Sequence, residues 1–181
     1  SGKLAETYPL CEADAPCSNY FPGRGLTAEH RESVYIGYRY YDKVKKPVRY
    51  PFGYGLSYTD FAWETVKFAV EEEMVTWQVK VTNTGKAAGK KAVQVYAQKP
   101  YTEYDKQWQI EKPAVEFVGY GKTKLLQPGE SQQLQICFDA ELLASYDDLG
   151  AVQKSAFLLE AGEYAVYVGN NVRNTEKCLT F

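Results

Sequence analysis

The segment Val75–Thr82, which reads VTWQVKVT, alternates apolar and polar side chains along its whole length. A period of two is typical of a half-buried β-strand, because successive side chains point to opposite faces of a sheet. The run ends at Asn83-Thr84-Gly85, and Asn and Gly both tolerate the positive φ that a tight turn demands. The sequence therefore predicts a strand that is closed by a tight turn.

The same alternation recurs further along the chain. We expect strands at Ala92–Ala97, around Leu134–Phe138 and around Tyr164–Val168. Leu126–Glu130 reads LQPGE, with Pro and then Gly at the central positions of a type II turn. Short strands separated by turn signals indicate an all-β, antiparallel β-sandwich. The one helical turn that we expect lies at Ala140–Tyr146.

The first third of the chain has a different composition. It is rich in Pro, Gly and Tyr, and these residues interrupt any sustained periodicity. We interpret it as an extended, mostly irregular linker, with one short strand within Val34–Tyr41. The predicted organisation is therefore the end of a preceding domain plus an interdomain linker over residues 1–60, and the sandwich over residues 61–181.

Composition excludes several classes of partner. The net charge of the 181 residues is −2 and no Lys/Arg cluster is present, which argues against nucleic acid. No run of 18 apolar residues is present, so no membrane partner is expected. The chain begins at Ser1 without an initiator Met, and we interpret it as a segment of a longer protein.

The four cysteines, at positions 11, 17, 137 and 178, have neither zinc-module spacing nor a CxxC pair. We expect free thiols, with a Cys11–Cys17 bridge as the alternative for an exported protein. The sequence also has no N-x-[ST] sequon. Both features favour a bacterial cytoplasmic origin over a secreted one.

The residues offer little catalytic chemistry. Glu32 and Asp42 flank an aromatic run and are the best available carboxylate pair, but we interpret them as partners of arginines or caps of turns. Glu71-Glu72-Glu73 is interpreted as a solvated hairpin tip. His30, the single histidine, has no Cys or Asp at ligand spacing. No catalytic, cofactor-binding or metal-binding residue is assigned, and no cofactor is expected.

Aromatic residues are the most distinctive feature, with 16 Tyr, 8 Phe and 3 Trp. Rings bury a large area while their hydroxyl groups still find partners, so they suit a partly wet interface. We predict that the linker packs through Tyr38, Arg39, Tyr40, Tyr41, Phe52 and Tyr54. Stacking of sugars in an open groove is the alternative. A second set, in the predicted loop 101–111, is a candidate for sugar contact: Tyr101, Tyr104 and Trp108.

Several ordered motifs resemble glycoside hydrolase family 3, the β-glucosidase family. They are SGKLAETYPL at 1–10, RESVYIGYRYYD at 31–42, YPFGYGLSYT at 50–59, VTNTG at 81–85 and VQVY at 93–96, and shorter matches continue to Gly169. Tyr50–Thr59 is the most specific of these. Ser33, Val115 and Val118 depart from the family pattern, and Tyr101–Glu111 resembles a lengthened loop.

The resemblance implies an immunoglobulin/fibronectin-III-like sandwich that follows the end of an α/β-sandwich domain. It also implies that the catalytic Asp and Glu lie in other domains of the parent enzyme. The implied function is a non-catalytic module that packs against the catalytic domains of the parent chain. One alternative is a carbohydrate-binding module that tethers the parent to an oligo- or polysaccharide, and another is a small autonomous hydrolase that uses Glu32.

Overall fold

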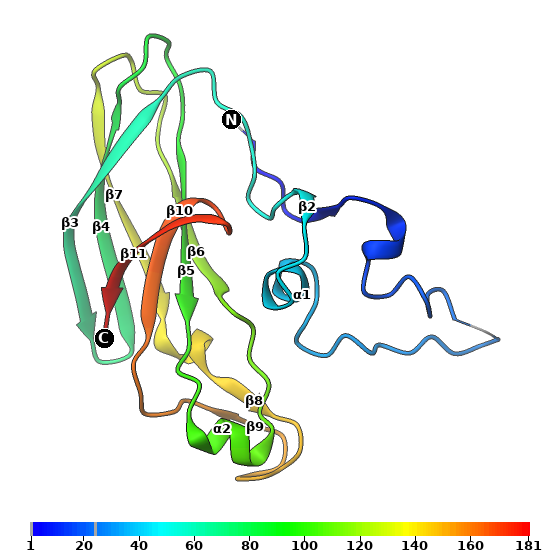
Figure 1. Cartoon of the computed structure of the whole chain (residues 1–181). Coiled ribbons are helices and arrows are strands. Elements are labelled where there is room, and N and C mark those ends of the chain that lie inside the picture. Colours follow the sequence, from blue (N-terminus) through cyan, green and yellow to red (C-terminus); the bar gives the residue numbers. More distant parts are fainter. Residues whose placement is uncertain (1, 24) are drawn as a thin grey trace.

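The computed structural model describes residues 2–23 and 25–181. Two antiparallel sheets face each other (Figure 1). One sheet has the order β3-β4-β7, formed by Phe61–Glu71, Met74–Asn83 and Ser131–Asp139. The other has the order β11-β10-β5-β6, formed by Asn174–Thr180, Ala165–Asn171, Ala92–Gln98 and Glu116–Lys122. The predicted β-sandwich is confirmed.

The core fills the space between the two sheets. Every second residue of β4, from Val75 to Val81, is almost fully buried and faces inward. These side chains meet valines of β5 and β10 on the opposite sheet, because the inward-facing residues of a sandwich alternate with outward-facing ones. Trp77 is the largest buried side chain, and its indole Nε1 donates a hydrogen bond to Thr65 Oγ1 at 3.1 Å.

The predicted turns lie where expected, but the reason for a glycine at position 85 differs from the one predicted. Gly129 has a φ of +80°, as the type II turn requires. Gly85 does not lie in the positive-φ region. Instead, a Cβ there would lie 2.1 Å from Thr59 Oγ1, so this glycine is needed for close approach. Asn83 is fully buried, and its amide joins Thr59 Oγ1 to the Ala87 and Leu126 carbonyls.

The lower end of the sandwich in Figure 1 carries the short elements α2 (Glu103–Trp108), β8 (Ser145–Asp147) and β9 (Ala156–Leu158). The 3-10 turn η2 covers Ala140–Leu143, within the stretch expected to be helical. The prediction of a loop over 101–111 is wrong, because α2 forms there. Its signal was a capping box, in which Thr102 and Asp105 bond each other's backbone N–H.

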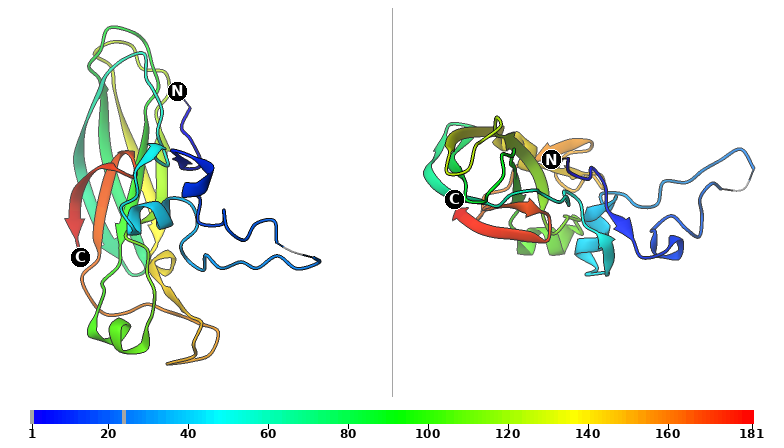
Figure 2. Two further views of the ribbon diagram at one scale, coloured as in Figure 1. Left: turned by 45° about the vertical axis from the view of Figure 1, so that its right-hand side comes forward. Right: turned by 90° about the horizontal axis from the view of Figure 1, so that it is seen from above.

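The linker contains β1 (Tyr8–Pro9), η1 (Glu12–Asp14), α1 (Tyr38–Lys43) and β2 (Val48–Tyr50). The predicted strand at Val34–Tyr41 is wrong, because Gly37 turns the chain at a φ of +58° and α1 begins at Tyr38. The described residues between η1 and α1, 15–23 and 25–37, form an excursion away from the sandwich, whereas α1 and β2 lie beside it (Figure 2). Among the described residues, no helix has the length and apolarity that crossing a membrane requires.

Candidate packing site on the four-stranded sheet

Strand β5 is buried on both faces. Val93 and Val95 belong to the core between the sheets, but Gln94 and Tyr96, which point the other way, are also buried. A strand of an antiparallel sheet commonly has one solvated face. Another part of the chain must therefore cover the outer face of this sheet.

Phe52 of the linker supplies this cover. Its ring centroid lies 5.4 Å from that of Phe117 and 6.5 Å from that of Tyr96, both in edge-to-face geometry. Tyr38 closes the cluster at 4.8 Å from Phe52, and its hydroxyl oxygen accepts a hydrogen bond from the Phe117 backbone N–H at 2.8 Å. Such aromatic pairs contribute about 0.5–1.5 kcal/mol beyond their buried area.

A buried amide fixes the linker to the same face. The Gln94 side-chain nitrogen donates to the backbone oxygens of Gly53 at 3.0 Å and Asn170 at 2.8 Å. The Gln94 side-chain oxygen accepts from the Tyr96 hydroxyl at 2.5 Å. Burial raises the pKa of Tyr96 far above its ordinary value, so this hydroxyl remains a donor. All of these polar groups are therefore satisfied inside the contact.

Ion pairs surround the aromatic cluster. Asp42 in α1 accepts from Arg173 Nε at 2.6 Å, as the arginine-partner interpretation of Asp42 predicted. Burial raises the pKa of the Asp42 carboxyl, although Arg173 opposes this shift. Arg39 pairs with Glu116 at 3.1 Å, and Glu116 also contacts Lys99 at 2.5 Å. The linker is thus held to the edge strand β6 and to the turn between β10 and β11.

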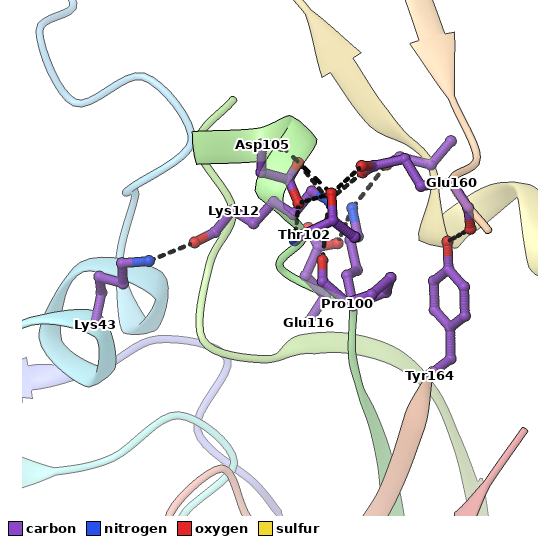
Figure 3. A network of polar contacts seen from close by, with 10 residues as sticks. Lys43, Pro100, Thr102, Asp105, Lys112, Glu116, Glu160 and Tyr164 are labelled. Atoms are coloured by element: carbon purple, nitrogen blue, oxygen red, sulfur yellow. Dashed lines mark hydrogen bonds and ion pairs between the residues drawn. The ribbon is translucent and has the colours of Figure 1, made fainter. Parts of the chain in front are cut away.

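A second polar cluster lies at the lower end of the sandwich (Figure 3). Lys112 is almost fully buried, and its ammonium contacts the Asp105 carboxylate at 2.7 Å, the Glu160 carboxylate and the Pro100 carbonyl at 2.9 Å. Asp105 also accepts from the Thr102 backbone N–H at 2.6 Å, as part of the capping box of α2. One lysine thereby joins α2 to the segment before β10.

The linker reaches this cluster as well, because Lys43 Nζ of α1 donates to the Lys112 carbonyl at 3.0 Å.

The hairpin of β8 and β9 is supported separately, by hydrogen bonds to the Asp147 carboxylate. This buried carboxylate accepts from the backbone N–H groups of Ala151, Val152 and Gln153 at 2.7–3.1 Å. These hydrogen bonds, above all that from Val152, lower the pKa of Asp147.

The predicted packing residues divide into two groups. Tyr38 and Phe52 contact the sandwich directly, Arg39 reaches it through Glu116, and Tyr41 is buried with Tyr40 edge-on at 5.2 Å. Tyr54 instead packs against Tyr50 in a tilted pair, with ring centroids 5.0 Å apart, in an open groove on the side of the linker. The groove is lined mainly by aromatic and apolar side chains: Leu4, Tyr8, Tyr50, Tyr54, Leu56 and Tyr58.

The three candidate sugar-contact residues do not form one platform. Tyr104 and Trp108 lie one turn apart on α2, with ring centroids 6.3 Å from each other. Tyr101 is separate from them and lies 5.6 Å from Lys43 Nζ in a cation–π contact. Two rings are therefore available on α2, and Trp108 is partly exposed.

The sequence did not predict the residues of the sandwich that contact the linker or form the cluster around Lys112. Gln94, Lys112, Glu160 and Arg173 were not singled out as site residues, although each contacts a partner more than ten positions away. A polar residue within an otherwise apolar strand, as at Gln94, was the one available signal. None of the four cysteines is joined in a disulfide in this structure.

Comparisons with known proteins agree with this architecture. Residues 91–172 match the family described as fibronectin type III-like domain. The chain is 42% identical to β-glucosidase A of Butyrivibrio fibrisolvens over 97% of its own length and 22% of that protein. A Paenibacillus barengoltzii β-glucosidase structure matches 98% of the chain at 40% identity, with a TM-score of 0.89, over 19% of that protein. The structure of the Bifidobacterium adolescentis GH3 β-glucosidase matches 99% of the chain at 33% identity, with a TM-score of 0.86, over 26% of that protein.

The fold and the matched residues define a fibronectin type III-like β-sandwich. More particularly, the chain is similar over nearly its whole length to the fibronectin type III-like region of glycoside hydrolase family 3 β-glucosidases, which supports an accessory domain of a glycoside hydrolase. The resemblance inferred from its motifs is confirmed. The chain spans about a fifth to a quarter of the length of these relatives.

Proposed function

We propose that this chain is a non-catalytic packing module of a β-glucosidase-like enzyme that hydrolyses O-glycosidic bonds. In this proposal, residues 1–60 end a preceding domain and link it to the sandwich of residues 61–181. The module holds the linker rigidly, and the linker in turn packs against the catalytic domains of the parent chain.

The observation that carries this proposal is that strand β5 is buried on both of its faces. Phe52, Gly53 and Tyr38 cover that face with rings and hydrogen bonds, so the linker and the sandwich share one packed unit. Tyr50, Tyr54 and Tyr58 stay on the other side of the linker, around the open groove. An aromatic groove of this kind supports contact with further domains of the parent.

Carbohydrate binding is the second candidate, favoured by the rings of Tyr104 and Trp108 on α2. We expect titration calorimetry of the purified chain with gluco- and xylo-oligosaccharides to give no saturable heat up to about 1 mM ligand, a free energy weaker than about −4 kcal/mol. The packing role needs no sugar affinity, whereas a tethering module does.

A saturable heat that Trp108→Ala abolishes would instead identify α2 as a sugar-binding platform. Phe157→Ala is the matched control, because Phe157 is another exposed ring, 73% accessible, on the nearby strand β9. Loss of the heat in both variants would point to a disturbed fold at this end of the sandwich, and would be checked by thermal unfolding.

A further inference from the structure

A polar cleft lies where the start of the chain, the segment before β3 and the turn between β10 and β11 meet. Its lining includes Lys3, Tyr54, Asp60, Lys91, Asn170 and Asn174. None of these side chains except Tyr54 belongs to the packing site described above. The cleft thus combines two ammonium groups with amides and the aromatic rings of Tyr54 and Phe61.

The two lysines enter the cleft from well-fixed backbone. Lys91 and Thr123 exchange two hydrogen bonds of 2.9 Å, from Thr123 N to Lys91 O and from Lys91 N to Thr123 Oγ1. The Leu4 backbone N–H donates to the Tyr54 carbonyl at 2.8 Å, which fixes the chain beside Lys3. Both ammonium groups are therefore positioned by the fold.

Neither ammonium forms an ion pair within the described residues. Lys3 Nζ donates to the Gly55 carbonyl at 3.2 Å, and Lys91 Nζ donates to Asn170 Oδ1. Lys91 Nζ also lies 4.9 Å from the centre of the Trp63 ring. An ammonium has three N–H donors, so each lysine keeps donors for a further acceptor.

The electrostatics of the cleft favour a negative ligand. Burial lowers the pKa of Lys91 to about 8, and the positive charge of Lys3 adds to this effect. Burial also lowers the pKa of Lys3. Asp60 is the one carboxylate in the lining, and it is exposed. An anion between the two ammonium groups would reduce their repulsion and gain charge-assisted hydrogen bonds.

We propose that this cleft binds a small oxyanion, a carboxylate or a phosphate, between the ammonium groups of Lys3 and Lys91, with the Asn170 side chain beside it. The ligand is a free anion or the acidic group of a larger molecule, since both present the same oxygens. This site is independent of the packing role proposed above, because that role does not use the two lysines.

Titration of the isotope-labelled chain with inorganic phosphate, and separately with sodium acetate, tests the proposal by NMR. We expect at least one of the two to give saturable shifts of the Lys91 and Asn170 signals, and a raised pKa of the Lys91 ammonium. A phosphate-only response assigns a phosphate ligand, and a response to acetate assigns a carboxylate. Sodium chloride at matched ionic strength should not reproduce the shifts.

Lys91→Met and Lys3→Met should each weaken the binding at least tenfold, whereas Lys91→Arg should largely keep it. Lys86→Met is the matched control, because Lys86 is an exposed lysine outside the cleft, and it should bind as the unmodified chain does. Lys3 lies in the linker, so its variant tests the site even if Lys91→Met unfolds. Shifts that do not saturate, or equal losses in Lys86→Met and Lys3→Met, would overturn the proposal.

Discussion

Replacing Lys112 by Met is expected to destabilise the folded chain by about 3–5 kcal/mol, the largest effect of any single change considered. The ammonium of Lys112 neutralises Asp105, which is fully buried, and Glu160. Without it, two carboxylates would share a site of low polarity, and charges left there without a partner carry a large desolvation cost. Chemical denaturation of the variant and the unmodified chain measures the difference.

Two comparisons make this expectation specific. Lys106→Met removes an exposed lysine of α2, the helix that carries Asp105; this lysine is paired with Glu103, and its loss should change stability by at most about 0.5 kcal/mol. Adding Asp105→Asn and Glu160→Gln to Lys112→Met should recover part of the loss, because the unpaired charges are then gone. A loss of less than 1 kcal/mol in Lys112→Met, or no recovery in the triple variant, would contradict the assigned role of the cluster.

Replacing Phe52 by Ala should destabilise the chain by about 3 kcal/mol, at the lower end of the range for Phe→Ala because this ring is only partly buried. The variant loses ring contacts with Tyr38, Phe117 and Tyr96. It also opens the outer face of β5 to water, so the amide protons beside Gln94 should exchange faster. Denaturation and hydrogen exchange together measure both consequences.

Tyr58→Ala is the matched control, since Tyr58 is a linker ring that is 98% exposed, and its removal should cost at most about 0.5 kcal/mol. Equal effects of Phe52→Ala and Tyr58→Ala would mean that the linker does not dock on the sheet through Phe52. Unchanged hydrogen exchange around Gln94 in Phe52→Ala would lead to the same conclusion.

The sandwich was predictable from sequence because its signals are local. Alternation in Val75–Val81 reports a buried face directly, and the Pro128-Gly129 pair specifies its turn. The short helices were not predicted, because α1 and α2 are six residues each and carry no apolar periodicity. At Gly85, the constraint is the distance to Thr59 and not the backbone angle, and no single stretch of sequence encodes that distance.

Only the linker residues of the candidate packing site were predictable from sequence. Tyr38 and Phe52 were identified from the aromatic density of the linker, and their contacts with the sheet agree with a packing role. Their partners were missed, because the pairing of Asp42 with Arg173 or of Gly53 with Gln94 depends on how distant segments fold together. Long-range polar contacts of this kind leave almost no pattern in one sequence.

We propose that this chain supports structure and does not cleave glycosidic bonds by itself. Retaining hydrolysis needs two carboxyl groups about 5–5.5 Å apart, one of them free to act as an acid. Asp42, one member of the candidate pair, is instead committed to Arg173.

The most direct test is an assay of the purified, folded chain with p-nitrophenyl β-D-glucoside. We predict no nitrophenol release above the buffer blank at any protein concentration. Release that rises in proportion to the protein, and that Glu32→Gln abolishes, would contradict the claim.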